Sequence, residues 1–251
     1  MLRTALRSLL VTVAAAALVA GPSLADAAPA QRAGDPTFHM QPVGSCHALT
    51  YKQLMSESTP ATAVPCTEAH TSRTIAEVRL TGKVDWKDVD ALWAKKGAKR
   101  CLPAWRSALG GNVKTRGMAT YVIAWFVPTA AERRQGAAWI RCDVVLLGGK
   151  KLQPLPTDGR RLLPVPLDDS VAYCLSPKGL MTVCARAHTY RAVRVFPLAG
   201  KRYPGDKRID AIAARKCPKV TGTKKAYWNH TTAEGWKYGE RLIRCLAKTR
   251  R

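Results

Sequence analysis

The chain has 251 residues and a formal net charge of +24, with 41 lysines and arginines against 17 aspartates and glutamates. Such an excess of cations favours anionic partners and makes their binding sensitive to salt, although it does not specify a fold. Apart from the N-terminus, no segment approaches the roughly 20 apolar residues of a membrane-spanning helix, so the composition disfavours an integral membrane protein.

The first 27 residues have the pattern of a secretory signal peptide. Arg3 and Arg7 supply positive charge, an apolar run follows from Leu9 to Ala20, and Ala25-Asp26-Ala27 offers a small-x-small cleavage site. The apolar run is shorter than a spanning helix. We therefore expect cleavage after Ala27 and a mature protein that is secreted or associated with the cell wall, without a transmembrane segment.

The rest of the chain contains a diverged internal repeat. The pattern Cys-x-x-Ala-His-Thr-x-Arg begins at Cys66 and again at Cys184, and an Ile-Arg-Cys triplet ends at Cys142 and at Cys245. Several matches in the same order and at similar spacing indicate two copies of one four-cysteine domain. The expected organisation is a flexible leader at 28–43, copy 1 at 44–149, a linker at 150–167 and copy 2 at 168–251.

Each copy is predicted to be a small α+β domain stabilised by disulfides, with the order strand, helix, strand, strand around an antiparallel sheet. In copy 1, the β-branched stretch 73–80 predicts a strand, and apolar residues at steps of three or four predict a helix over 86–101. Pro103 predicts the end of that helix. The stretches 119–127 and 142–147 predict two further strands. Copy 2 repeats the pattern, with Pro218 in the place of Pro103.

The eight cysteines predict four disulfides, because an even count in an exported chain is typical of an oxidised framework. Four cysteines in one copy permit three pairings. A strand of about 26 Å and a helix of about 24 Å, packed antiparallel, would return the third cysteine to the second. The predicted pairs are therefore nested: Cys46–Cys142 and Cys66–Cys101 in copy 1, and Cys174–Cys245 and Cys184–Cys217 in copy 2.

Two histidine–arginine pairs at repeated positions are the candidate binding residues: His70 with Arg73, and His188 with Arg191. The alternative interpretation is structural, with each histidine bonding to the backbone of a turn. The Cys-x-x-x-His spacing also raises the possibility of zinc. Zinc sites usually contain cysteine pairs two to four residues apart, and this sequence has none. We therefore predict no metal and no cofactor.

No grouping of residues predicts catalysis. The sequence lacks a Gly-x-Ser-x-Gly elbow, a phosphate-binding loop, a His-Glu-x-x-His segment and a dinucleotide fingerprint. Its carboxylates suggest no glycosidase pair. We therefore predict no catalytic residues and a protein that is not an enzyme. The seven tryptophans predict core packing, with a sugar-stacking surface as the alternative.

The cysteine order resembles a known family. Gly44-Ser45-Cys46, then Val64-Pro65-Cys66 with a histidine four residues later, is similar to the septum formation domain of high-GC Gram-positive bacteria. Trp236-Lys237-Tyr238-Gly239 before Cys245 matches the end of that pattern, and the resemblance extends over both copies. It implies an extracytoplasmic protein connected with division or the envelope, with no established catalytic residues.

This sequence departs from the family pattern near its candidate binding residues. An alanine, rather than the family's proline, precedes each histidine, and Arg73 and Arg191 follow where the family has an acid. We predict a non-catalytic, septum-formation-related protein that binds an anionic cell-envelope polymer or an envelope protein. The alternatives are an inhibitor or modulator of an exported enzyme and, less favoured, a wall-active hydrolase. Charge alone would allow nucleic-acid binding, but export makes it incidental, so no specific nucleic-acid partner is predicted.

Overall fold

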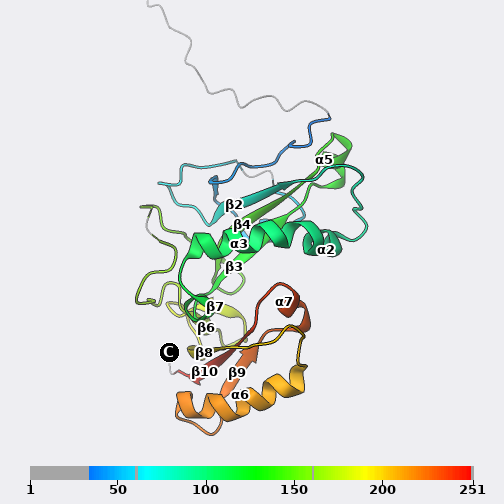
Figure 1. The fold of residues 1–251 in the computed structure, drawn as a ribbon. Helices are drawn as coiled ribbons and strands as arrows, with labels where there is room; N and C mark the ends of the chain where they lie inside the picture. The colour runs from blue at the N-terminus through cyan, green and yellow to red at the C-terminus, as the bar shows by residue number, and fades with distance from the viewer. Residues whose placement is uncertain (1–33, 60–61, 160, 250–251) are drawn as a thin grey trace, which may run out of the picture. The chain divides into compact units, whose positions relative to one another are not determined.

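The computed structural model describes residues 34–59, 62–159 and 161–249 (Figure 1). The predicted signal peptide at 1–27 and the leader residues 28–33 lie outside these described residues. The fold is α+β, as predicted, with two antiparallel five-stranded sheets and four disulfides. No helix within the described ranges combines the length and apolar character needed to cross a membrane.

The first half forms one sheet with the strand order β1-β2-β4-β3, and β5 pairs with β4. Its longest helix, α3, lies against β2 and β4 and buries Ala98 and Cys101, three residues apart, toward the sheet. The elements are β1 (Cys46–His47), α1 (Tyr51–Leu54), β2 (Ser72–Arg79), α2 (Val89–Leu92), the π-helix η1 (Trp93–Gly97), α3 (Ala98–Leu109), α4 (Val113–Gly117), β3 (Tyr121–Phe126), α5 (Ala130–Arg134), β4 (Trp139–Leu147) and β5 (Leu152–Gln153).

The second half forms a sheet with the order β7-β6-β8-β10-β9. Helix α6 covers it with Ile209, Ala213 and Cys217, which follow one another at steps of four and are fully buried. The predicted apolar face of this helix is therefore confirmed. The elements are β6 (Tyr173–Leu175), β7 (Met181–Val183), β8 (Tyr190–Pro197), α6 (Asp206–Thr221), β9 (Tyr227–His230), α7 (Ala233–Lys237) and β10 (Leu242–Lys248).

The two halves share strand register as well as element order. Trp125 lies opposite Cys142 across β3 and β4, and Trp228 lies opposite Cys245 across β9 and β10. The first cysteine of each half lies opposite the arginine that ends the repeated histidine motif. Corresponding residues therefore occupy corresponding places in both sheets.

The predicted nested disulfides are wrong. Each half instead joins its first cysteine to its second and its third to its fourth, and no cysteine in the described ranges is free. The pairs Cys46–Cys142, Cys66–Cys101, Cys174–Cys245 and Cys184–Cys217 do not form. The observed pairs are Cys46–Cys66, Cys101–Cys142, Cys174–Cys184 and Cys217–Cys245.

The error arose from the predicted end of the helix. Pro103 does not end it, because α3 continues to Leu109 with the proline inside. The lost helical hydrogen bond costs about 3 kcal/mol, which the burial of Leu109, worth about 1.5–3 kcal/mol, and the disulfide at Cys101 together offset. Cys101 therefore faces the middle of the sheet, in the same core cluster as Cys142. Pro218 likewise lies inside α6, which ends at Thr221.

The described part of the predicted leader is not a free segment. Met40 is buried, and the indole Nε1 of Trp139 donates a hydrogen bond to the backbone oxygen of Phe38 at 2.8 Å. Met40 packs with Trp139 and Val145, which alternate with the helix-facing residues of β4. Residues 34–43 therefore cover part of the face of the first sheet opposite α3, where the apolar side chains of Trp139 and Val145 need a cover.

The predicted linker at 150–167 also contributes residues to the folded core. It contributes β5, and its residues Leu155, Leu162 and Leu163 are buried in a cluster with Leu109 of the first half and Val183 of the second. Prolines and glycines suggested an exposed connection, but the leucines between them supply apolar surface that both sheets cover. The two halves share this core within one compact unit, Gln31–Arg251.

A buried ion pair lies inside the first sheet. Arg141 and Asp143 have fully buried side chains, with Nε of the arginine 3.1 Å from Oδ1 of the aspartate. Asp143 also accepts hydrogen bonds from the hydroxyls of Ser72 and Thr74, and the guanidinium of Arg141 lies 4.4 Å from the ring centroid of Phe126. Burial lowers the pKa of Arg141, and the charge of Asp143 opposes that shift.

Candidate anion-binding site

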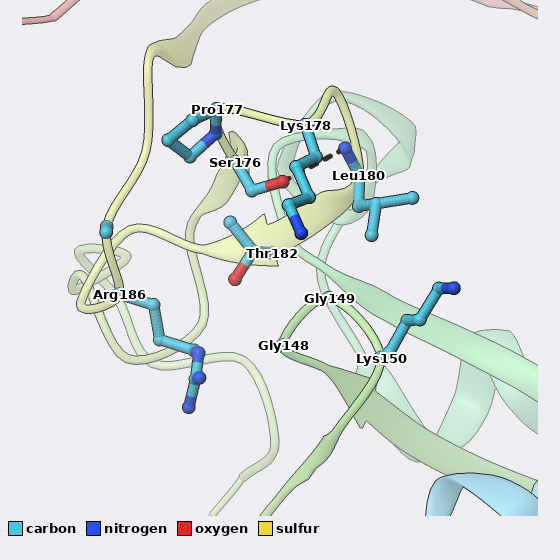
Figure 2. Close-up of a pocket in the computed structure, with 10 residues that line it drawn as sticks. Gly148, Gly149, Lys150, Ser176, Pro177, Lys178, Leu180, Thr182 and Arg186 are labelled. Carbon is cyan, nitrogen blue, oxygen red and sulfur yellow. Dashed lines mark hydrogen bonds between the residues drawn. The ribbon is translucent and has the colours of Figure 1, made fainter.

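A cavity of about 590 Å³ opens where the turn after β4 meets the β6–β7 hairpin (Figure 2). Small ligands occupy cavities of about 300–1,000 Å³, so this one can hold a monomer of a larger polymer. Its lining contains three cations and no acid. The lining residues are Gly148, Gly149, Lys150, Ser176, Pro177, Lys178, Leu180, Thr182, Arg186 and Ala187.

Local backbone geometry holds the two walls together. Gly149 has φ 74°, a left-handed conformation that glycine adopts without strain, and its N–H donates to the carbonyl of Met181 at 2.9 Å. The hairpin turn is closed by Ser176, whose Oγ accepts from the N–H of Leu180 at 3.1 Å (dashed in Figure 2). The Cys174–Cys184 disulfide joins β6 to the residue that follows β7. The cavity is therefore supported by a cross-linked hairpin.

Figure 2 shows the three cationic side chains coming from separate segments: Lys150 from the turn after β4, Lys178 from the hairpin tip and Arg186 from the turn after β7. All three residues are exposed. None forms an ion pair with the residues that the structure describes. Three cations without an acid create a positive potential, which suits the oxygens of a phosphate or carboxylate ligand.

The predicted binding residues do not line this cavity. His70 and His188 are buried, and each ring donates from Nδ1 at 2.8 Å to the backbone oxygen two residues earlier. For His188 that acceptor belongs to Arg186, so the histidine holds the turn that presents a lining cation. Arg191 pairs with Asp169, and Arg73 makes no ion pair with a described residue.

Sequence reasoning missed all three lining cations. Lys150 and Lys178 lie at turns, next to Gly149 and Pro177, and neither belongs to the repeated motifs on which the site prediction rested. Basic residues at glycine- and proline-marked turns were the available signal. Arg186 lies inside the repeated motif, at a position where the first half has Glu68. The change from Glu68 in the first half to Arg186 in the second was therefore the sequence signal for this residue.

One cluster of potential metal ligands occurs among the described residues, formed by Cys174, Cys184 and His188, with ligand atoms within 4.8 Å of one another. A cysteine ligates zinc only as a thiolate. Because both sulfurs of this cluster are joined in a disulfide, only one imidazole remains as a ligand. The arrangement is a histidine packed beside a disulfide.

Comparison with protein-family models gives a match over most of the chain. A family model described as septum formation matches residues 42–245. The chain belongs to the septum formation family. No curated protein matches it, and no solved structure does.

In this septum formation protein the matched region extends across both halves, including the cavity and all four disulfides. Membership connects the chain with septum formation. The disulfides and the family together fit an extracytoplasmic protein, because such bonds persist in oxidising surroundings.

Proposed function

We propose that this septum formation protein is a secreted, non-catalytic binding protein that holds an anionic cell-envelope polymer in its cationic cavity. The observation that carries the proposal is the cavity lining, in which Lys150, Lys178 and Arg186 surround about 590 Å³ with no acid among the lining residues. The net charge of +24 supports it, because a strongly cationic surface attracts polyanions before contact.

The buried carboxylates of the described residues support a binding role rather than a catalytic one. Glu132 caps α5 and accepts hydrogen bonds from Thr129 and Ser58, while Asp143 is held in the ion pair with Arg141. Both acids therefore have structural partners away from the cavity. Purified protein should release no soluble fragments from labelled peptidoglycan, and sustained release would contradict the non-catalytic role.

Replacement of the three lining cations tests the binding proposal. K150Q/K178Q/R186Q should weaken binding to purified cell-wall sacculi and to inorganic polyphosphate by about tenfold or more, since each close charge contact is worth on the order of 1 kcal/mol. The slope of log affinity against log salt should fall by about 1 for each cation removed. Sedimentation across a salt series measures both quantities.

The matched control is K95Q/K96Q/K99Q, which removes the same charge from exposed lysines of η1 and α3. Its affinity should change by less than about threefold, because distant exposed charges are screened by salt. Equal weakening in both triple variants would show that total charge, rather than the cavity, determines binding. Such a result would show that the cavity is not the binding site.

A further inference from the structure

A second cavity, of about 460 Å³, is lined by residues of both halves and shares none with the cationic cavity. Its volume lies within the range of about 300–1,000 Å³ that small ligands occupy. Aromatic side chains form much of the lining, and they are Trp93, Trp105, Trp125, Tyr121, Tyr173 and Tyr238. A wall of aromatic rings suits a ligand that has flat apolar faces.

One wall of this cavity comes from a helix that changes pitch at Trp93. The chain passes from α2 through the π-helix η1 into α3 without a break, whereas α6 of the second half is α-helical throughout. Counted back from the cysteine that each helix buries, Gly97 takes the place of Ala213. A Cβ at position 97 would lie 2.4 Å from the Trp93 ring, so glycine lets that ring lie against the helix backbone. Single π-turns within α-helices are rare and occur frequently at functional sites, so η1 singles out the aromatic wall as a candidate binding surface.

Trp125 of β3 is the ring best placed to meet a ligand. The buried ring of Trp93 stacks on it at a centroid distance of 5.2 Å and an interplanar angle of 14°. Tyr238, which follows α7, meets Trp93 edge-on at a centroid distance of 6.3 Å. Trp125 and Tyr238 are only partly buried, and within the described ranges no further ring stacks on Trp125. Trp93 therefore supports the other two rings, which keep exposed surface in the cavity lining.

Hydrogen-bonding groups of both charges line the cavity together with these rings. Arg106 is exposed and forms no ion pair with a described residue. The side chain of Glu240 is 44% exposed and accepts from Arg244 through one oxygen, Oε1. Arg116, in contrast, already donates to two backbone carbonyls and so holds the wall itself. A ligand in the cavity can therefore meet both a guanidinium that donates and a carboxylate that accepts.

We propose that this cavity binds a pyranose ring of a neutral glycan. A pyranose with equatorial substituents carries C–H groups on its two faces and hydroxyls around its edge, so its faces match the exposed rings of Trp125 and Tyr238. Each hydroxyl both donates and accepts hydrogen bonds, and the edge of the sugar therefore matches Arg106 and Glu240 in one lining.

Other classes of ligand fit this lining less well. An anion would meet the carboxylate of Glu240, and a cation would meet the guanidinium of Arg106. A wholly apolar ligand would remove water from both groups without replacing its hydrogen bonds. The proposal concerns a separate cavity and an uncharged ligand, so it does not depend on the anion-binding site.

The test uses the intact mature protein and two neutral oligosaccharides, cellotetraose and the β-1,4-linked tetramer of N-acetylglucosamine. We expect at least one of them to bind with a Kd of about 1 mM or lower, measured by calorimetry. The affinity should change by less than about twofold between low and high salt, because the ligand carries no charge to be screened. K150Q/K178Q/R186Q should also leave the affinity within about twofold, because those cations line the other cavity.

Protein variants locate the sugar in this cavity. W125A should weaken binding by about tenfold or more, because it removes the stacking surface. The matched control is W228A, which removes the tryptophan at the corresponding place of the second sheet, outside the cavity lining, and should leave the affinity within about twofold. R106Q and E240Q change exposed side chains, and each should weaken binding by about threefold or more through a lost hydrogen bond.

Three outcomes would overturn the proposal. The first is that neither tetramer binds at about 10 mM, and the second is an affinity that falls about tenfold or more as salt is raised. The third is that W125A weakens binding no more than W228A does. Near-ultraviolet circular dichroism checks the fold of both tryptophan variants, and if W125A does not fold, full affinity in both R106Q and E240Q overturns the proposal instead.

Discussion

Asp143→Ala should lower the free energy of unfolding by about 3–5 kcal/mol, because it leaves a buried guanidinium without its anionic partner. Arg141 is 0% exposed, and its Nη1 has no hydrogen-bond partner among the described residues. Asp143 is therefore the principal counter-charge of this cation. Urea denaturation at neutral pH measures the change.

The double variant R141M/D143L should recover at least half of that loss, since well-packed apolar residues replace a buried pair at little net cost. The second half provides a matched control. Arg244 holds the position in β10 that Arg141 holds in β4, but its partner Glu240 is 44% exposed. E240Q should therefore cost less than about 1 kcal/mol. A loss below about 1 kcal/mol for D143A would show that the buried pair is not a stabilising element.

Removal of the Cys101–Cys142 disulfide should cost about 4 kcal/mol, because this bond closes the longest loop of the four, with a separation of 41 residues. Both cysteines are fully buried between α3 and β4, so alanine at each position also loses packing. Thermal unfolding of C101A/C142A should shift downward by about 8–16 °C.

The hairpin disulfide Cys174–Cys184 is the comparison for loop length. Its separation of 10 residues gives an expected loss of about 2.7 kcal/mol in C174A/C184A. Peptide mapping without reduction checks the pairing itself and should recover Cys46 linked to Cys66. If C174A/C184A is destabilised more than C101A/C142A, loop entropy and core burial do not determine the contribution of these bonds.

Local pattern was sufficient for most of the secondary structure. The β-branched stretch 73–80 corresponds to β2 (Ser72–Arg79), and the stretch 119–127 contains β3. The apolar positions of α6 are buried as their spacing requires. These predictions succeeded because side-chain periodicity reflects which face of a helix or strand is covered, and that information is local.

The cationic cavity could not be predicted in the same way. Lys150, Lys178 and Arg186 come from three turns and meet only because Gly149 bonds to Met181 across the two halves. The repeated histidines drew the prediction to His70 and His188, whose recurrence is matched by a common hydrogen bond to the backbone. The repeated histidines therefore have the same structural role in both halves. The candidate binding site lies at positions where the two halves differ.

The sequence by itself determined the α+β class, the strand–helix–strand–strand core of each half, the use of cysteines as disulfides and the resemblance to the septum formation family. Tertiary structure decided which cysteines pair, that Leu155, Leu162 and Leu163 of the predicted linker are core residues, and which cations share a cavity. The physical reason is that pairing and burial depend on where an element ends and what covers it. The continuation of α3 through Pro103 to Leu109 is a balance between one lost hydrogen bond and long-range packing, and that balance exists only in the folded chain.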